Sequence, residues 1–345
     1  MTLPRRVALA HWDSYELTFR LAKGETSPLA ESIIPNLRAG NVSGFLFAIG
    51  GDSDEHSGDH EDPLVGTIAI RDQLLKEVAS ASDDITIAFS SSDIEAAEAD
   101  GKIWMMLSIE GSRPLRGTTE VLDVLYELGV RSVGLTWNGR NEVGDGVGVD
   151  NPGGLTKFGR SVVRAMNKKG MIIDVSHFAP KGLEDVLSIS STPVMATHSN
   201  ARALSEHPRN LTDEQIRAIG DAGGVIGINF LATFLAPNLE SLSPESPPTV
   251  NDVVRQVLYI GDLIGIENVL VGGDLTYDPW RAEIGRKRSY QGVPVGIGMS
   301  VRAPVHEFPE TTKLVDALDG SGLTTKEIEG VLNGNLARHI REVLA

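Results

Sequence analysis

The 345-residue sequence contains no cysteine. This absence excludes disulfides, thiolate metal sites and cysteine nucleophiles, so any bound metal ion must be held by His, Asp or Glu. Positive charge is also scarce, with 31 Lys and Arg against 47 Asp and Glu and a formal net charge of −16. Such a charge repels nucleic acid and anionic membrane surfaces, and we expect neither as a partner.

Long apolar runs are absent as well. No segment approaches the roughly 18 consecutive apolar residues that a membrane-spanning helix requires. The amino-terminal sequence MTLPRRVALAHWDSYEL has an apolar run that is too short for a signal peptide, and Asp13 and Glu16 follow it directly. The sequence therefore predicts a cytoplasmic protein without a membrane segment.

Short apolar segments alternate with helical patterns along the whole chain. Eight segments have the length of buried strands, at 5–10, 41–49, 102–109, 130–136, 171–175, 193–196, 224–230 and 268–271. Helical patterns occur at 27–39, 64–81, 94–100, 118–128, 156–169, 181–189, 212–222 and 250–264, and two more helices are expected after residue 311. This alternation predicts a (β/α)8 TIM barrel that forms one domain over residues 1–345.

Five of the eight predicted strands end in histidine or a carboxylate. Active sites of such barrels lie at the carboxyl ends of the strands, so these side chains should meet there. A single histidine in such a place is more often a core or capping residue. Unrelated core histidines would not be expected to occur at the ends of several strands, however. The candidates are His11 with Asp13, Glu110, His177, His198 and Asp274.

Three histidines and three carboxylates without a thiol suit Zn²⁺, with Mn²⁺ or Co²⁺ as substitutes. The set is too large for one tetrahedral ion, and it would be fully used by two ions that share a carboxylate. Glu110 is the only glutamate among the candidates, and we expect it to bridge. His11 and Asp13 would then complete one site, and His177 and His198 the other.

Two loops offer weaker signals. The acidic loop GGDSDEHSGDHEDP carries His56 and His60, and we interpret it as a solvated, mobile loop rather than a metal site. The glycine-rich stretch GDGVGVDNPGGL contains Gly144, Gly146 and Gly148 but lacks the lysine and hydroxyl of a phosphate-binding loop. We interpret it as a long, partly ordered surface loop.

The same motifs resemble a known family. HWD at 11–13, SIEG at 108–111, IDVSH at 173–177, THSNARAL at 197–204, HPRNLTDE at 207–214 and GGD at 272–274 occur in this order. His177 and His198 are 21 residues apart. Together these features are similar to the membrane dipeptidase (renal dipeptidase, M19) family of the amidohydrolase superfamily, and the resemblance covers nearly the whole chain.

The resemblance implies a zinc-dependent dipeptidase that hydrolyses L-Xaa-L-Xaa or L-Xaa-D-Xaa through a metal-bridging hydroxide. It agrees with the ligand assignment made from the residues. It further implies that Arg209 holds the substrate carboxylate and that Asp274 carries the proton to the leaving amine. In related barrels the aspartate on the last strand is a metal ligand, so both roles stay open for Asp274. The family also suggests a homodimer.

The sequence departs from the family pattern at the end of the fourth strand. Animal members have a histidine there that can polarise the substrate carbonyl, whereas this chain has Trp137. Indole offers one donor and no positive charge, so Asn138, a metal ion or another group must stabilise the oxyanion, or the substrate must sit differently. Leu9 and Ala10 also replace the usual aspartate and glycine before His11.

Two other functions remain as alternatives. A binuclear lactonase or phosphotriesterase would bridge its metals with a modified lysine at the position of Trp137, where this chain has no lysine. A metal-binding barrel without turnover would be expected to lack a ligand or Asp274, and none is missing. A cluster of basic residues follows Asp274 in an otherwise acidic protein: Arg281, Arg286, Lys287 and Arg288. It is either a solvated basic loop or the origin of a preference for dipeptides that end in D-Asp or D-Glu.

Overall fold

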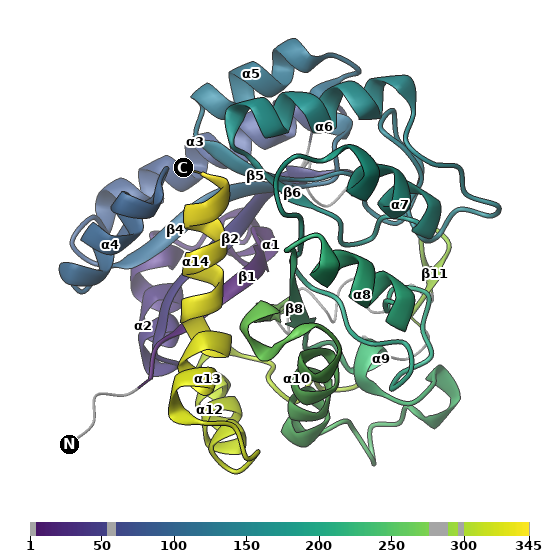
Figure 1. The fold of residues 1–345 in the computed structure, drawn as a ribbon. Helices are drawn as coiled ribbons and strands as arrows, with labels where there is room; N and C mark the ends of the chain where they lie inside the picture. The colour runs from purple at the N-terminus through teal and green to yellow at the C-terminus, as the bar shows by residue number, and fades with distance from the viewer. Residues whose placement is uncertain (1–4, 54–59, 276–288, 296–299, 345) are drawn as a thin grey trace.

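The computed structural model describes residues 5–53, 60–275, 289–295 and 300–344. Eight parallel strands close into a barrel, and helices surround it (Figure 1). Each strand pairs with the next one around the ring, β2 pairs with β4, and β9 returns to β1. The barrel strands are β1 Val7–Asp13, β2 Val42–Gly51, β4 Ile103–Glu110, β5 Val130–Gly134, β6 Ile172–Asp174, β7 Met195–Ala196, β8 Val225–Asn229 and β9 Val269–Gly273. The predicted (β/α)8 barrel is confirmed.

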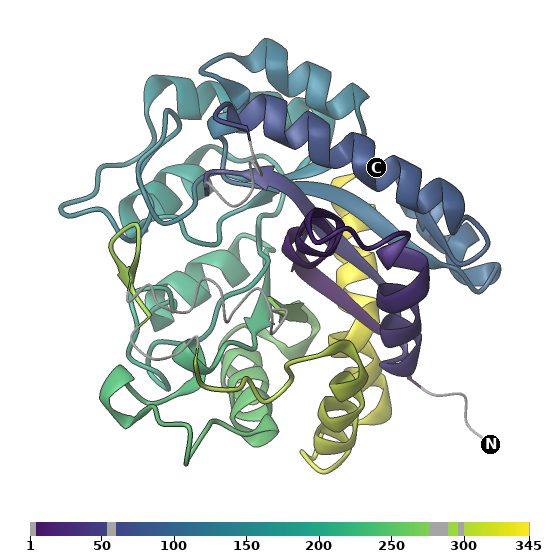
Figure 2. The same ribbon diagram turned by 180° about the vertical axis from the view of Figure 1, so that it is seen from behind.

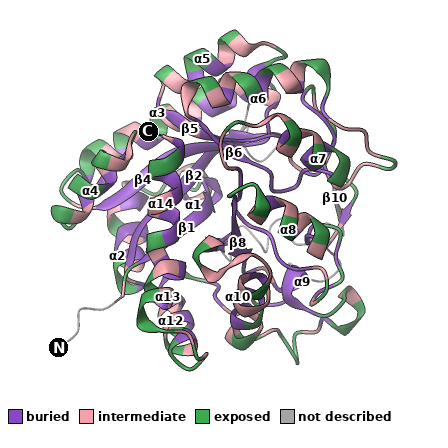
Figure 3. Cartoon of the chain, in the orientation of Figure 1, coloured by how far each residue is buried: buried purple, intermediate pink, exposed green. Residues whose placement is uncertain are grey.

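The helices cover the outer face of the barrel, and their exposed sides face away from it (Figure 3). Several begin with a side-chain cap, as in α8, where Thr212 and Gln215 form the predicted capping box. Those that follow the amino-terminal strands are α1 Tyr15–Ala22, α2 Ile34–Ala39, α3 Pro63–Ser80, α4 Ser91–Ala99, α5 Thr119–Glu127 and α6 Lys157–Lys169. The later ones are α7 Pro180–Ile189, α8 Asp213–Asp221, α9 Ala232–Leu235, α10 Val250–Ile264, α12 Thr311–Asp319, α13 Thr325–Glu329 and α14 Asn335–Val343.

The interior of the barrel is filled at its amino-terminal end by large apolar side chains. Trp104 and Met106 of β4 belong to a cluster with residues from β1, β2, β6, β7, β8 and β9. Leu336, Ile340 and Val343 of α14 join the same cluster. In Figure 1 α14 runs across the front of the strands, and in the opposite view it lies behind them (Figure 2). This helix therefore closes one end of the barrel, which leaves the other end for the site.

Several elements differ from those expected. Strand β3 (Ile85–Ile87) was not predicted, and it pairs with the first residues of β4 outside the ring. Helix α1 was not predicted either. The helix expected at 27–39 is a π-helical turn, Leu29–Ile33, continued by α2. Two closing helices were expected after residue 311, and the structure has three, α12, α13 and α14. A π-helical turn, Gly330–Gly334, joins α13 to α14.

A further strand pair, β10 (Ser289–Tyr290) and β11 (Val293–Pro294), forms an antiparallel hairpin outside the barrel. It stands at the edge of the molecule, away from α14 (Figure 2). None of the helices in the described parts of the chain is long and apolar enough to cross a membrane.

Gly44 provides a test of the barrel interior. A methyl group at this position would lie 2.1 Å from the ring of Trp104, so the large side chain fills the space that the glycine leaves. We expect Gly44→Ala to lower the free energy of unfolding by about 1–3 kcal/mol through overpacking. Urea denaturation measures the change.

The control is Gly320→Ala, where the new methyl group would meet its nearest neighbour, the Ala317 carbonyl oxygen, at 3.6 Å. That variant should change stability by less than about 0.5 kcal/mol. In a Trp104→Leu background, where the ring is gone, Gly44→Ala should lower the free energy of unfolding by less than it does in the parent. Equal effects of the two alanine substitutions would contradict the packing argument.

Candidate metal centre

The structure brings the six predicted strand-end residues to one end of the barrel. His11, Asp13, Glu110, His177 and His198 are 1–7% exposed, and Asp274 is partly buried. All six therefore line the end opposite α14. His11 and Asp13 lie on β1, Glu110 is the last residue of β4, and His177, His198 and Asp274 follow β6, β7 and β9.

A β-bulge in β1 sets the direction of the side chains on that strand. Leu9 pairs with Phe45 and Trp12 pairs with Phe47, so β1 has one more residue than β2 between these pairs. The extra residue reverses the alternation of inward and outward side chains. Trp12 therefore packs outward against both phenylalanine rings, and His11 faces the centre of the barrel.

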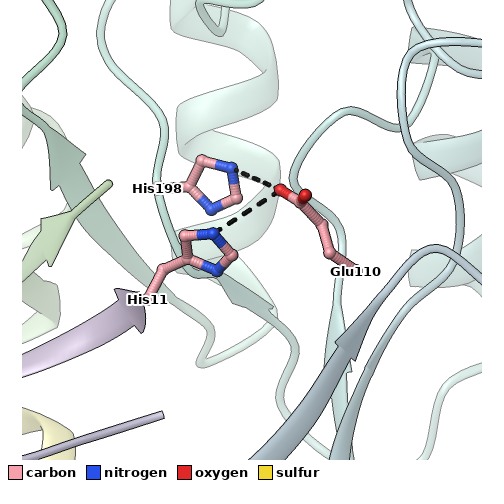
Figure 4. Close-up of side chains that lie close together, drawn as sticks. All are labelled: His11, Glu110 and His198. Atoms are coloured by element: carbon pink, nitrogen blue, oxygen red, sulfur yellow. Dashed lines mark ion pairs between the residues drawn. The ribbon is translucent and has the colours of Figure 1, made fainter. Parts of the chain in front are cut away.

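Three imidazoles surround one oxygen of Glu110. Oε1 lies 3.1 Å from Nε2 of His177, 3.2 Å from Nε2 of His198 and 3.6 Å from Nε2 of His11. Figure 4 shows His11 on β1 and His198 on the loop after β7, both pointing at this carboxylate. The rings of His11 and His198 stack at 4.0 Å, and Nε2 of His177 lies 2.9 Å from Nε2 of His198.

Hydrogen bonds on the far side of two rings decide which nitrogen carries the proton. His177 Nδ1 lies 2.7 Å from the amide oxygen of Asn138, which can only accept. The Thr197 hydroxyl donates to Asp174 Oδ2 at 2.7 Å, so its oxygen accepts from His198 Nδ1 at 2.8 Å. In its neutral form, each ring therefore turns an unprotonated Nε2 toward Glu110.

This arrangement fits a metal ion. Zn–N bonds of about 2.0–2.1 Å in a tetrahedron place neighbouring ligand atoms about 3.3 Å apart, and the measured separations around Glu110 Oε1 lie on both sides of that value. Two imidazole lone pairs and a carboxylate oxygen that face one another repel, and a cation between them would remove the repulsion. The donors, nitrogen and oxygen without sulfur, are those that Zn²⁺ accepts.

A second group of candidate ligand atoms shares His11. The His11 nitrogen and one oxygen each of Asp13 and Asp274 lie within 4.8 Å of one another, as do those of His11, Glu110 and His198. His11 Nε2 is 3.3 Å from Asp13 Oδ1. The geometry thus brings Asp274 within reach of an ion at His11 and Asp13, and both of its predicted roles remain possible.

The site is electrostatically crowded. Burial, together with Asp13 and Asp274, raises the pKa of Glu110 well above its usual value, although His11 opposes the shift. Burial lowers the pKa of His11, but the nearby carboxylates of Asp13, Glu110 and Asp274 outweigh it and raise the pKa to about 10. Burial lowers the pKa of His198 well below its usual value, and His11 and Arg209 lower it further. Carboxylates packed this closely favour the binding of cations.

Arg209 lies beside this centre on the loop after β7. It is 3% exposed, and its Nη2 donates to the carbonyl oxygen of the metal-ligand candidate His198 at 3.0 Å. Its Nε has no hydrogen-bond partner among the described residues. Burial lowers its pKa to about 10, against the opposing effect of Asp274 and Glu110, so the guanidinium keeps its charge at neutral pH. A buried, charged fork with an unused donor is suited to a carboxylate.

Trp137, which stands where animal members have a histidine, lies beside His177, as does Asn138, one of the groups considered for stabilising the oxyanion. The Trp137 ring centroid is 6.0 Å from that of His177, and the Asn138 amide oxygen accepts a hydrogen bond from His177 Nδ1. Asn138 therefore orients a metal-ligand candidate. Its expected role as a substrate ligand stays a prediction.

Asp52 is a buried residue of the site region to which the sequence analysis assigned no role. It is 2% exposed and accepts hydrogen bonds from the backbone N–H groups of Arg113 and Trp137 and from the Asn141 amide. Its own N–H donates to the Glu110 carbonyl oxygen. Burial raises its pKa to about 6, although its donors lower it. The signal was present in the sequence, because Gly-Gly-Asp ends β2 at 50–52 as it ends β9 at 272–274.

The glycine-rich stretch is not the loosely ordered surface loop that was expected. Val143 to Gly146 are buried, and the Val147 N–H donates to the carbonyl oxygen of His177. A side chain at Gly146 would overlap the backbone of Trp137 and Asn138. Gly146 therefore permits close backbone contact beside His177.

Some predictions fall outside the described residues. His56 of the acidic loop lies there, and His60 is exposed. The basic cluster of Arg281, Arg286, Lys287 and Arg288 also lies outside them.

Comparisons with known proteins bear on this site. A sequence model of the membrane dipeptidase family (peptidase family M19) matches residues 10–283. The dipeptidase tcpJ of Claviceps purpurea is 30% identical over 311 residues, which span 89% of this chain and 67% of that protein. A Klebsiella pneumoniae protein named only for the pqqA 5′ region is 37% identical over 223 residues, or 63% of this chain and 80% of that one.

Solved structures share the fold. A dipeptidase of metallopeptidase family M19 superposes with a TM-score of 0.81 at 23% identity, and the match covers 99% of both chains. A Rhodobacter sphaeroides metallopeptidase, liganded with a phosphinate mimic of L-Ala-D-Ala, gives 0.81 at 22% identity over 98% of this chain and 99% of that one. The family match spans most of the sequence, and the residues that carried the resemblance meet at one buried centre. The chain therefore belongs to the membrane dipeptidase family, peptidase family M19, and is a metal-dependent peptidase.

Proposed function

We propose that this protein hydrolyses the peptide bond of free dipeptides, L-Xaa-L-Xaa or L-Xaa-D-Xaa, with two Zn²⁺ ions bound at the carboxyl end of the barrel. The observation that carries the proposal is the meeting of three imidazole Nε2 atoms around one Glu110 oxygen, with the buried guanidinium of Arg209 beside them. The first feature supports a metal centre, and the second supports a substrate that carries a carboxylate.

The proposed metal ligands are those expected from the strand ends, and the closeness of their donor atoms supports them. His177 and His198 would hold one ion, His11 and Asp13 the other, and Glu110 would serve both. Bound cations supply two functions at such a site, since they acidify a water molecule and polarise the peptide carbonyl. Asn138 and Thr197 keep the unprotonated Nε2 atoms of the two histidines directed inward.

Asp274 is suited to moving the proton. Its Oδ2 accepts a hydrogen bond from the Asn229 amide at 2.7 Å, which leaves Oδ1 to take a proton and return it to the leaving amine. Its backbone has φ of 62° after Gly273 at 96°, so the chain makes a left-handed turn directly after β9. General acid–base catalysis of this kind requires the carboxyl group within hydrogen-bond reach of the amine.

Arg209 would bind the carboxylate of the second substrate residue. A planar guanidinium binds a carboxylate through two parallel hydrogen bonds, and its link to the His198 carbonyl fixes its distance from the metal centre. A substrate held by its carboxylate at Arg209 and by its reacting carbonyl at the metals has little length to spare. This arrangement admits one residue after the reacting bond, and a free amino group held by a metal ion or by nearby carboxylates would limit the substrate to two residues.

The first prediction concerns substrate choice. Protein freed of metal with a chelator and reconstituted with Zn²⁺ should release amino acids from free dipeptides, including L-Ala-D-Ala, and the metal-free protein should not. Tripeptides and N-acetylated dipeptides should be poor substrates. Amino-acid analysis measures the products. Turnover of only lactones or phosphoesters would favour the alternative hydrolase, and zinc binding without any turnover would favour a non-catalytic barrel.

The second prediction concerns Glu110. We expect Glu110→Gln to weaken zinc binding by more than the roughly 10–100-fold that loss of an outer hydrogen-bonding partner costs, because an amide oxygen carries no negative charge. Competition with a coloured chelator measures the affinity. The matched control is Glu77→Gln, at a buried glutamate on α3 whose carboxylate accepts a hydrogen bond from the Leu29 N–H. The zinc affinity of this variant should match that of the parent. Equal affinity of the Glu110 variant would contradict the bridging role.

The third prediction concerns Arg209. Arg209→Lys keeps the charge but removes the two-point fork, and we expect kcat/KM for free dipeptides to fall about 10–100-fold, or about 1.4–2.8 kcal/mol. Zinc content should be unchanged. The control is Arg160→Lys, at an arginine that pairs with Asp185 on the outer helices. If Arg209→Lys loses zinc but kcat/KM does not fall selectively for substrates with a free carboxylate, the result would argue against the clamp.

A further inference from the structure

His207 has both ring nitrogens engaged although it is not among the residues assigned to catalysis. It lies on the loop between β7 and α8, two residues before Arg209, and is 1% exposed. Its Nδ1 lies 3.1 Å from the backbone nitrogen of Arg209, and its Nε2 lies 2.7 Å from the carbonyl oxygen of Pro294. The ring thus joins the arginine to strand β11.

The chemistry of these partners determines the protonation state of the ring. The Arg209 N–H can only donate, so His207 Nδ1 accepts, and the Pro294 carbonyl can only accept, so Nε2 carries the proton. One neutral tautomer meets both demands. Burial lowers the pKa of His207 to about 4, with Arg209 and Arg202 lowering it and the Pro294 contact opposing them, so the ring is neutral over the physiological range.

Phe234 completes the support of the arginine. Its ring centroid lies 4.7 Å from that of His207, and the guanidinium carbon of Arg209 lies 5.6 Å from the same ring. The other end of the guanidinium donates to the carbonyl oxygen of His198. The backbone of Arg209 is therefore fixed by His207, and its side chain is held between an aromatic ring and the loop of a metal-ligand candidate.

The hairpin of β10 and β11 is attached on its other side to the loop after β5. Gln291 accepts a hydrogen bond from the Gly139 N–H at 2.7 Å. Gly148 approaches Gln291 so closely that a side chain at 148 would overlap its carbonyl oxygen. The hairpin therefore bridges the loop of Asn138 and the loop of Arg209, and His207 is its hydrogen-bonded link to the second.

We propose that His207 is a positioning residue that holds Arg209 in place for the substrate carboxylate through Nδ1 and ties the β10–β11 hairpin to the same loop through Nε2. The inference rests on the proposed function, because it assigns a task to the clamp named there. His207 acts through Arg209 and need not touch the substrate. Its contribution should therefore appear only with substrates that carry a free carboxylate.

Three substitutions separate the two hydrogen bonds. In His207→Asn the amide oxygen takes the place of Nδ1 and keeps the acceptor for Arg209, whereas in His207→Gln the amide nitrogen takes the place of Nε2 and keeps the donor to Pro294. His207→Leu removes both. The control is His339→Leu, the same change at a buried histidine of α14 at the other end of the barrel.

The measured quantity is the ratio of kcat/KM for a free dipeptide to that for its C-terminal amide. We expect the ratio to fall about tenfold in the Gln and Leu variants, to stay within about threefold of the parent in the Asn variant, and to be unchanged in His339→Leu. If His207→Leu does not fold, the Asn and Gln variants still decide the question. Equal losses on both substrates, or a ratio kept by Gln and lost by Asn, would overturn the role of Nδ1.

The parent enzyme separates the failure of this inference from failure of the proposed function. A parent that prefers the free dipeptide, together with a His207→Gln variant that keeps the preference, would remove only the role of His207. A parent that hydrolyses the free dipeptide and the amide equally well would overturn the carboxylate clamp itself, and the role of His207 with it.

Discussion

Mutual repulsion among three hydrogen-bond acceptors is the constraint on which this structure depends. Two unprotonated imidazole nitrogens and a carboxylate oxygen face one another at 2.9–3.2 Å in a buried site. Without a cation such a cluster is unfavourable, because burial removes the water that would otherwise solvate each group. A rigid, closed barrel can hold these atoms in place because each belongs to a residue at the end of, or shortly after, a different strand of one hydrogen-bonded ring.

Strand β4 shows how a single strand serves both stability and chemistry. Its inward side chains run from Trp104 and Met106, which pack with α14, through Ser108 to Glu110. The apolar end supplies the packing that offsets the cost of the polar end. Hydrogen bonds beyond the metal-ligand candidates, such as those of Asp52 and Asp174, then set ring orientation and loop position.

Local sequence patterns were sufficient for the barrel. The eight strands follow apolar runs of the right length, and the helix at 212–222 begins at a recognisable cap. The pattern could not identify β3, a three-residue strand whose pairing with β4 is a long-range event. Nor could it distinguish a loosely ordered loop from one packed on the site. Glycines such as Gly146 and Gly148 occur in both kinds of loop, and only the tertiary contacts of these two show that the loop is packed.

By itself, the sequence determined which chemical groups stand at the strand ends, because strand length and the identity of the next residue are local properties. His11, Glu110, His177 and His198 could be named as candidate ligands on that basis. The tertiary structure alone decided how they point. The bulge in β1 reverses its side-chain alternation, Asn138 and Thr197 select the histidine tautomers, and His207 joins Arg209 to a hairpin about 85 residues further along the chain. Each depends on contacts between distant segments, and such contacts exist only when the barrel is closed.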